Sequence, residues 1–400
     1  MKKHFSFSPP AIELIGKIMA FIVIILMTHL LSIEDMGKYS IVISVVMISS
    51  VFMDGGVNNK IYTLILQDID SKLSDYYSQK IIFSFFTVVS ITIYAYFTYS
   101  FWIDILLYIL MTFFVSQIIL YKFIYRASQN RKWDIITILI DPLSKLLTIS
   151  IIYFAKNNIS LWSVLLAFLI VSIVEYIVVN RYFKNHYKNF HYIQPTLKKF
   201  IEIFNEIKYF IFFYFLYILY QRIDIFFIEK FLSSDDVAIY FSAYNIYMAV
   251  IIFITALVSF SFPKIKKFSL KEQLLYFKRY FVLLPIALLF TYYTLPNIYP
   301  IIYPKNYSSG ANILFWLLGA TPFVFITYLI IFNLNFLKQE KASIFPILFI
   351  LIFKIFIFNF AMTYFDTTVV FAQSYIIFEF LLSVLFLIMF QKNKQKGINE

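Results

Sequence analysis

Cysteine is absent from this chain of 400 residues, and the other residues that commonly bind metals are scarce. Without a thiol, the chain can form no disulfide, no thiolate metal site and no cysteine nucleophile. Its four histidines, at positions 4, 29, 186 and 191, do not have the spacing of metal ligands. The sequence therefore predicts no metal site, no cofactor and no catalytic residue.

Charged residues are also few, because Asp, Glu, Lys and Arg make up only 14% of the chain. Hydrophobic residues make up 61%, and the mean hydropathy is +0.80. This composition excludes a soluble domain, which would lack an adequate polar surface. A helix needs about 20 apolar residues to cross the hydrocarbon core of a membrane.

Apolar runs of that length predict an all-α polytopic membrane protein with twelve transmembrane helices. The first run begins after residues 1–4 and is too long for the core of a signal peptide, so we expect a retained helix. The predicted spans are roughly 11–31, 39–57, 81–99, 101–121, 135–154, 161–180, 209–228, 237–262, 280–299, 311–333, 344–365 and 369–390.

The net charge of +12 is explained by where the basic residues lie. If the N-terminus is cytoplasmic, 26 of the 34 Lys and Arg fall in cytoplasmic loops and tails, and only 4 fall outside. This bias predicts that both termini face the cytoplasm. Nucleic-acid binding, the other common reason for a basic chain, is disfavoured because these charges border membrane spans. Cytoplasmic residues 264–279 also have the pattern of an amphipathic helix on the inner leaflet.

Two loops half a chain apart match each other. Residues 31–39 (LSIEDMGKY) and 232–240 (LSSDDVAIY) are offset by 201 positions, with Leu, Ser, the second Asp and Tyr identical. Such a repeat predicts two six-helix lobes, with the binding site between them and alternating access as one lobe moves against the other. We therefore expect an N-terminal lobe at 1–180, a basic cytoplasmic linker at 181–208, a C-terminal lobe at 209–390 and a cytoplasmic tail at 391–400.

The same two regions resemble a known family. Residues 31–56, a SIEDMGKYS turn followed by an apolar helix and Asp54-Gly55-Gly56, resemble the start of the polysaccharide flippases often called Wzx. Residues 220–240, followed by Ser242-Ala243-Tyr244, are similar to the opening of the second lobe in that family, with Ala238 where Gly is usual. These flippases belong to a superfamily that also holds lipid II flippases and multidrug antiporters.

The resemblance implies export of an undecaprenyl-pyrophosphate-linked oligosaccharide, an O-antigen or capsule repeat unit, to the outer leaflet of a bacterial inner membrane. It also implies a polysaccharide polymerase and a chain-length regulator as partners, beside the membrane lipids. No enzymatic activity is implied.

Charges inside the spans are the best candidate site residues, because each costs a few kcal/mol unless it is paired or faces water. Folding consecutive spans into hairpins brings opposite charges to similar depth: Lys17 with Asp54, Asp141 and Lys145 with Glu175, and Lys354 with Glu379. These groups could be structural ion pairs. The ten candidates are Glu13, Lys17, Asp54, Asp141, Lys145, Glu175, Arg222, Asp224, Lys354 and Glu379.

Cationic candidates suit the pyrophosphate of the implied substrate. We expect Arg222, Lys17, Lys145 and Lys354 to be substrate-binding. Arg222 is the leading candidate because the next span offers Tyr244 and Asn245 at its depth instead of a carboxylate. Its alternatives are neutralisation by Asp224 or snorkelling to the outer headgroups.

Carboxylates within the spans could couple export to H⁺ or Na⁺ antiport, or could pair with the cations. The candidates are Asp54, Asp141, Glu175, Asp224, Glu379 and Glu13.

Two other functions remain possible at this point. A membrane-embedded O-antigen polymerase would need a sizeable outer loop, and the longest outer loop here is 300–310. A multidrug antiporter of the same superfamily would favour an apolar, acidic cavity over one with four intramembrane cations.

Overall fold

A computed structural model of the chain describes residues 9–67, 72–155, 159–187, 192–194, 196–266, 268–336, 340–361, 364 and 367–396. Within these ranges the regular structure is helical throughout, which agrees with the predicted all-α fold. The helices are α1 (Pro9–Leu30), α2 (Ile33–Asp54), α3 (Val57–Leu66), α4 (Leu73–Thr98), α5 (Trp102–Ala127), α6 (Arg131–Ala155), α7 (Leu161–His186), α8 (Leu197–Phe231), α9 (Ser234–Ile265), α10 (Leu270–Tyr276), α11 (Lys278–Ile302), the 3₁₀ turn η2 (Lys305–Tyr307), α12 (Gly310–Gly319), α13 (Thr321–Phe336), α14 (Glu340–Ala361) and α15 (Val369–Lys396).

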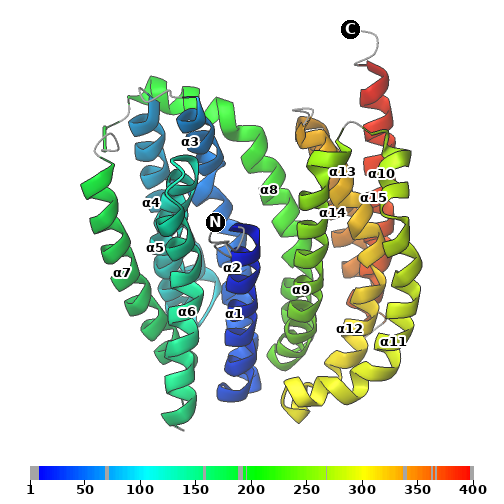
Figure 1. Cartoon of the computed structure of the whole chain (residues 1–400). Helices are drawn as coiled ribbons and strands as arrows, with labels where there is room; N and C mark the ends of the chain where they lie inside the picture. Colours follow the sequence, from blue (N-terminus) through cyan, green and yellow to red (C-terminus); the bar gives the residue numbers. More distant parts are fainter. Residues whose placement is uncertain are drawn as a thin grey trace, which may run out of the picture. The chain divides into compact units, whose positions relative to one another are not determined.

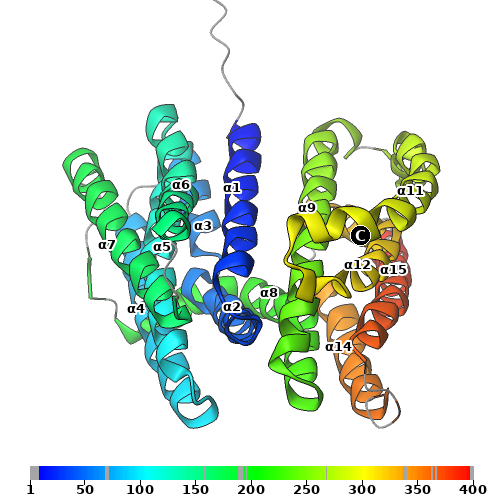
Figure 2. The same ribbon diagram turned by 90° about the horizontal axis from the view of Figure 1, so that it is seen from below.

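The chain divides into two compact units, residues 1–215 and 216–400. In the first unit, α5 packs against α2, α3, α4, α6 and α7, and α1 packs mainly against α6 (Figures 1 and 2). In the second unit, α15 packs against α12, α13 and α14, while α9 packs against α12 and α13. Each unit is therefore a helical bundle built around one central helix, α5 or α15.

The chain is a multi-pass membrane protein, but its helices do not all correspond to straight spans. Ten described helices are long and apolar enough to cross a membrane, or eleven if one bent pair counts as a single span. That pair is α12 and α13, which meet at an angle of 48° just before Pro322. The predicted span 311–333 is therefore broken, as expected where a proline removes a helical hydrogen bond. The predicted span 280–299 coincides with α11, which is not among these candidates, so the count of twelve stays a prediction.

Parts of the predicted linker (181–208) and of the predicted tail (391–400) are helical. Helix α7 continues to His186 and α8 begins at Leu197, so helical structure occupies both ends of the stretch 181–208. Helix α8 runs for 35 residues through the boundary between the two units. Its first half belongs to the first unit, where Glu206 forms an ion pair with Lys60 (2.7 Å) and accepts a hydrogen bond from Tyr76 (2.8 Å). Helix α15 likewise extends through Lys396. The predicted division into lobes is not tested by these bounds.

The two matching loops adopt matching structures. Ser32 caps α2 by accepting a hydrogen bond from the backbone N–H of Asp35 (3.1 Å). Ser233 caps α9 by accepting one from Asp236 (3.2 Å). A serine at this position satisfies one of the free N–H groups at the start of a helix. The sequence repeat is thus also a repeat of local structure.

The Asp54-Gly55-Gly56 motif forms a tight junction between α2 and α3. Both glycines have positive φ, 53° and 75°, a conformation that costs little only for glycine. A Cβ on Gly56 would lie 2.7 Å from the Phe210 ring on α8. The motif therefore ends α2 sharply and lets α8 approach the turn.

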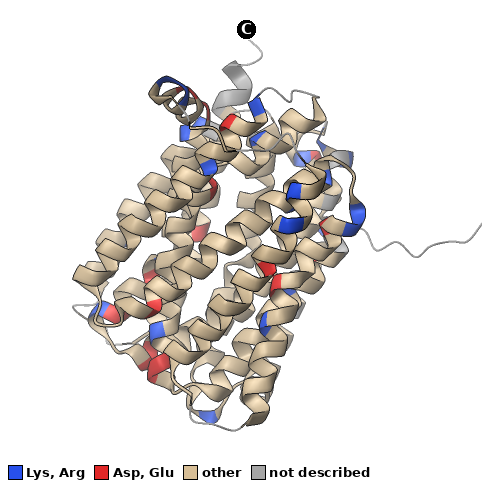
Figure 3. Cartoon of the chain, turned by 90° about the vertical axis from the view of Figure 1, so that its left-hand side faces the viewer, with Lys and Arg blue, Asp and Glu red and all other residues tan. Residues whose placement is uncertain are grey.

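Lys and Arg lie mostly toward the ends of helices, while acidic and basic positions also occur along the helices (Figure 3). Basic residues that border apolar helices are typical of the loops of membrane proteins. Residues 1–8, which include the predicted cytoplasmic N-terminus, lie outside the described residues.

Candidate functional site

A buried ion pair forms the centre of the polar site in the second unit. Lys354 of α14 is fully buried, and its Nζ lies 2.5 Å from Oδ1 of Asp224 on α8. The same Nζ donates a hydrogen bond to the backbone carbonyl of Tyr220 (3.0 Å). The ammonium also lies 4.6–5.8 Å from the ring centres of four aromatic residues, which attract cations electrostatically. These rings belong to Tyr220, Phe358, Tyr375 and Phe378. Lys354 is therefore well satisfied without a substrate.

Two tyrosines complete this cluster. Tyr240, near the start of α9, donates a hydrogen bond to Asp224 (2.7 Å). Tyr220 donates one to Glu379 of α15 (3.0 Å). All four side chains are at least 95% buried. When every group is ionised, Lys354, Asp224 and Glu379 together carry a net charge of −1.

The structure corrects the predicted partner of Lys354. The hairpin argument paired it with Glu379 on the following span, whereas the close ion pair is with Asp224. The hairpin argument compared the depths of charges on consecutive spans only. It could not reveal this pairing, because α8 and α14 are more than 100 residues apart in the sequence. Asp224 therefore pairs with Lys354, whereas the alternative role of Asp224 was to neutralise Arg222.

Arg222 lies two residues before Asp224 and is directed elsewhere. It is 5% exposed, and its guanidinium carbon lies 5.0 Å from the ring centre of Tyr244 on α9. The predicted match in depth with Tyr244 is thus present as a cation–π contact. A snorkelling arginine would keep its head in the headgroup region, and the burial of Arg222 disfavours that alternative.

Tyrosines connect the surroundings of Arg222 with those of Lys354. The rings of Tyr240, Tyr244, Tyr247, Tyr375 and Tyr220 lie in successive contact, with centres 5.6–6.2 Å apart. Apart from Tyr244, sequence reasoning missed these residues because the chain has 32 tyrosines. A usable signal was their spacing at 240, 244 and 247, which places three tyrosines on one face of α9.

In the first unit, a second polar cluster joins α6 and α7. Lys145 forms an ion pair with Asp141 one turn earlier on α6 (2.6 Å). Between them, Ser144 donates a hydrogen bond to Glu175 of α7, which is 4% exposed. The predicted proximity of these three charges is therefore found. Lys145 already has a carboxylate partner, and Glu175 has a hydroxyl donor.

Glu13 and Lys17, one turn apart on α1, have different surroundings. Glu13 accepts a hydrogen bond from Arg126 of α5 (2.9 Å) and lies 3.6 Å from Lys122. Arg126 also pairs with Asp134 of α6 (3.3 Å). This network ties α1 to α5 and α6, which indicates a structural role for Glu13. Lys17, in contrast, is exposed.

Asp54 has a partner that the sequence did not suggest. Its carboxylate lies 3.8 Å from Nζ of Lys80 on α4, a residue with no exposed surface. The hairpin argument had placed Asp54 at the depth of Lys17. Lys80 was assigned to a loop just before the span 81–99, but α4 begins at Leu73, so Lys80 lies within the helix.

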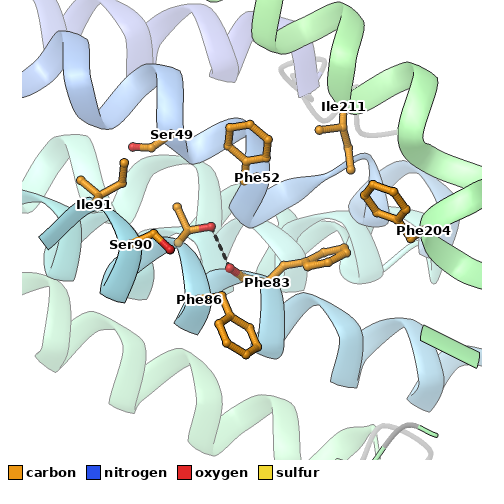
Figure 4. Close-up of a pocket in the computed structure, with 9 residues that line it drawn as sticks. Ser49, Phe52, Phe83, Phe86, Ser90, Ile91, Phe204 and Ile211 are labelled. Carbon is orange, nitrogen blue, oxygen red and sulfur yellow. Dashed lines mark hydrogen bonds between the residues drawn. The ribbon is translucent and has the colours of Figure 1, made fainter. Parts of the chain in front are cut away.

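Close to Asp54, a groove of about 330 Å³ opens between α2, α4 and α8. Figure 4 shows aromatic rings and aliphatic side chains around it, with two serine hydroxyls on one side. Thr87 in its wall donates a hydrogen bond to the Phe83 carbonyl (2.7 Å). The groove is mainly apolar and of the size that binds small ligands. Its lining residues are Ser49, Phe52, Phe83, Phe86, Thr87, Ser90, Ile91, Phe204 and Ile211.

Among the described residues, no group of three His, Asp or Glu side chains is arranged to hold a metal ion. The chemistry available is instead electrostatic. Buried cations can attract an anionic group, carboxylates can exchange a proton, and tyrosine hydroxyls can donate hydrogen bonds.

Comparisons with known proteins give a family and a fold. The family described as "Polysaccharide biosynthesis protein" matches residues 7–269. No curated protein matches the chain at a significant level.

Several solved transporters have a similar fold, each at 14% sequence identity. A lipid II flippase, MurJ, in an inward closed conformation has a TM-score of 0.71, with 94% of this chain and 85% of that chain covered. An inward-facing multidrug resistance transporter of the MATE family and MOP superfamily has a TM-score of 0.63, with 96% and 94% covered. A transporter of the MOP superfamily from Pyrococcus furiosus also has a TM-score of 0.63, with 97% and 96% covered. At this identity the likeness shows the fold alone, which the chain shares with these transporters.

Proposed function

We propose that this chain, which belongs to the polysaccharide biosynthesis protein family, is a flippase for lipid-linked oligosaccharides. Its substrate would be an O-antigen or capsule repeat unit on undecaprenyl pyrophosphate. It would carry this lipid from the cytoplasmic to the periplasmic leaflet of a bacterial inner membrane. The family match over residues 7–269 is the observation that carries this proposal.

The fold supports transport by alternating access. Two compact units, a repeated loop and many apolar helices are the features of a transporter in which two halves move around one site. We place both termini in the cytoplasm, as the distribution of basic residues indicates. A polymerase and a chain-length regulator would use the exported repeat unit.

Arg222 and Lys17 are our candidates for contact with the pyrophosphate. Guanidinium groups bind phosphate oxygens through several donors at once, and a cation within the membrane attracts an anionic headgroup. Lys17 is exposed, whereas Arg222 is buried over Tyr244 and would have to become accessible as the units move. Lys145 and Lys354 already have carboxylate partners, so we assign them to the support of the site.

The cluster in the second unit would couple export to a proton. Lys354 already occupies the position beside Asp224 where a bound cation would lie. Glu379 accepts a hydrogen bond from a tyrosine and gives the cluster of Lys354, Asp224 and Glu379 a net charge of −1, which one proton would neutralise. Because a fixed ammonium repels Na⁺, we favour H⁺ as the coupling ion over Na⁺. Asp54, Asp141 and Glu175 remain alternative coupling residues.

Substitution of Arg222 tests the proposed contact. In a strain that lacks its own flippase, Arg222→Lys should retain part of the surface polysaccharide because a point charge still attracts phosphate. Arg222→Ala and Arg222→Gln should accumulate lipid-linked repeat units in the cytoplasmic leaflet. Lys230→Gln, which removes a cation from the end of the same helix, serves as the control. Full surface polysaccharide from Arg222→Ala at normal protein abundance would rule out the contact.

Multidrug antiport is the second candidate, favoured by the fold shared with a MATE transporter. An antiporter would protect cells against cationic drugs and would not restore surface polysaccharide. The same strain therefore separates the two functions, because drug resistance without polysaccharide export would support the antiporter.

A further inference from the structure

A second groove lies in the second unit, away from the charge cluster around Lys354. It opens beside α10, α11 and the C-terminal part of α15 and has a volume of about 700 Å³. Its floor and walls are apolar, and its polar lining residues are Ser269, Lys271, Lys278 and Gln391. The apolar lining residues are Leu270, Leu274, Leu275, Phe281, Val282, Leu387 and Phe390.

The short helix α10 that forms one wall is held firmly in place. Ser269 and Glu272 form a capping box at its start. Gln273, which is 1% exposed, exchanges two hydrogen bonds with Asn333 of α13 (3.1 and 2.8 Å). Leu270 and Leu274 pack against a buried apolar core that includes Phe277. The groove is therefore preformed and does not need a ligand to order it.

Charge at this groove is positive. Lys271 and Lys278 line it and are exposed. The neighbouring carboxylate, Glu272, is engaged with the backbone N–H and hydroxyl of Ser269 (2.7 and 2.8 Å). Two lysines at the rim of an apolar groove match a molecule with an anionic head and a hydrocarbon tail.

The location also fits such a ligand. The segment 264–279 contains six Lys or Arg residues and lies on the predicted cytoplasmic side. The cytoplasmic leaflet carries anionic lipids, which basic pockets between transmembrane helices bind. Leu275 and Val282, both more than half exposed, present apolar surface at the same place.

We propose that this groove binds one anionic phospholipid of the cytoplasmic leaflet. Lys271 and Lys278 would contact its phosphate, and an acyl chain would lie along Leu274, Val282 and Leu387. The site is separate from the proposed substrate contacts and does not depend on the proposed function.

Native mass spectrometry of the full-length chain in detergent, with added phosphatidylglycerol or phosphatidylcholine, tests this site. We expect the wild type to retain one phosphatidylglycerol more tightly than phosphatidylcholine. Lys271→Gln/Lys278→Gln should weaken phosphatidylglycerol binding by about 30-fold, since each lysine near an anionic lipid contributes about 1 kcal/mol. The matched control, Lys264→Gln/Arg279→Gln, removes two charges from the same segment but none from the groove and should bind like the wild type.

A third variant tests the tail. Val282→Trp keeps the charge but fills the groove, so it should also lose the bound lipid, while its thermal unfolding midpoint shows that the fold is intact. Unchanged phosphatidylglycerol binding in the groove double variant would overturn the proposal. Tighter binding of undecaprenyl phosphate than of phosphatidylglycerol, lost in the same variants, would also overturn it by assigning the groove to a polyprenyl chain.

Discussion

Lys354 and Asp224 are each almost completely removed from water, and each is the charged partner of the other. Removal of one partner from a buried pair leaves an uncompensated charge, which typically costs about 3–5 kcal/mol. We therefore expect Lys354→Met and Asp224→Asn to lower the thermal unfolding midpoint strongly when introduced singly. The double variant should recover most of that loss. As a control, Lys38→Met breaks an ion pair near the surface and should change the midpoint little.

Glu379 gives the contrasting case. If it were the partner of Lys354, as depth along the hairpin predicts, Lys354→Met/Glu379→Gln would be the double variant that recovers stability. Such a result, with no recovery from Lys354→Met/Asp224→Asn, would contradict the pairing in the structure.

The identities of the important residues could be predicted better than their contacts. Arg222, Asp224, Lys354 and Glu379 all stand out in the sequence as charges within apolar runs, and all four are buried. The contact of Arg222 with Tyr244 was predicted from depth along consecutive helices. The close partners of Asp224, Lys354 and Glu379 could not be predicted, because contacts between distant helices leave no periodic signal. Lys80 was missed for a different reason, since the helix that buries it begins earlier than its apolar run.

At the scale of the helices, apolar runs predicted most elements correctly, because a membrane span requires about 20 such residues. The positions where one helix ends and the next begins were harder to predict from the sequence. The break between α12 and α13 required a proline at one particular position in an otherwise uninterrupted apolar run. The length of α8 could not be predicted from apolar runs, because its first half carries charged residues, among them Glu206, which pairs with Lys60 of α3.

The close packing of the α2–α3 junction against α8 can be tested by substitution of Gly56. Gly56→Ala would place a Cβ 2.7 Å from the Phe210 ring at a residue with φ of 75°, so both strain and a clash oppose it. We expect a lower unfolding midpoint and a weakened contact between this turn and α8. Gly16→Ala, where the nearest atom would be at an ordinary 3.4 Å, is the matched control. Equal midpoints for the two variants would contradict the tight junction.

Across the whole molecule, the distribution of basic residues makes a prediction about topology. Reporter fusions after Lys3, Asn189 and Lys394 should all report the cytoplasm, and fusions at Ser234 and Ser308 should report the outside. The physical reason is the excess of Lys and Arg in the cytoplasmic loops. An outside signal at Asn189 would mean that the spans are miscounted and would contradict the two-lobed arrangement.

The central claim is that this chain moves a lipid-linked oligosaccharide between leaflets, and reconstitution tests it most directly. Proteoliposomes would carry undecaprenyl-pyrophosphate-linked repeat units with a labelled sugar, and a membrane-impermeant glycosidase would report the label that reaches the outer leaflet. We expect the wild type to expose the label, faster under an imposed proton gradient than under a sodium gradient, and Arg222→Ala to slow exposure by at least about tenfold, equivalent to 1.4 kcal/mol. A wild-type protein that leaves the label inaccessible, although it is folded and correctly inserted, would contradict the account.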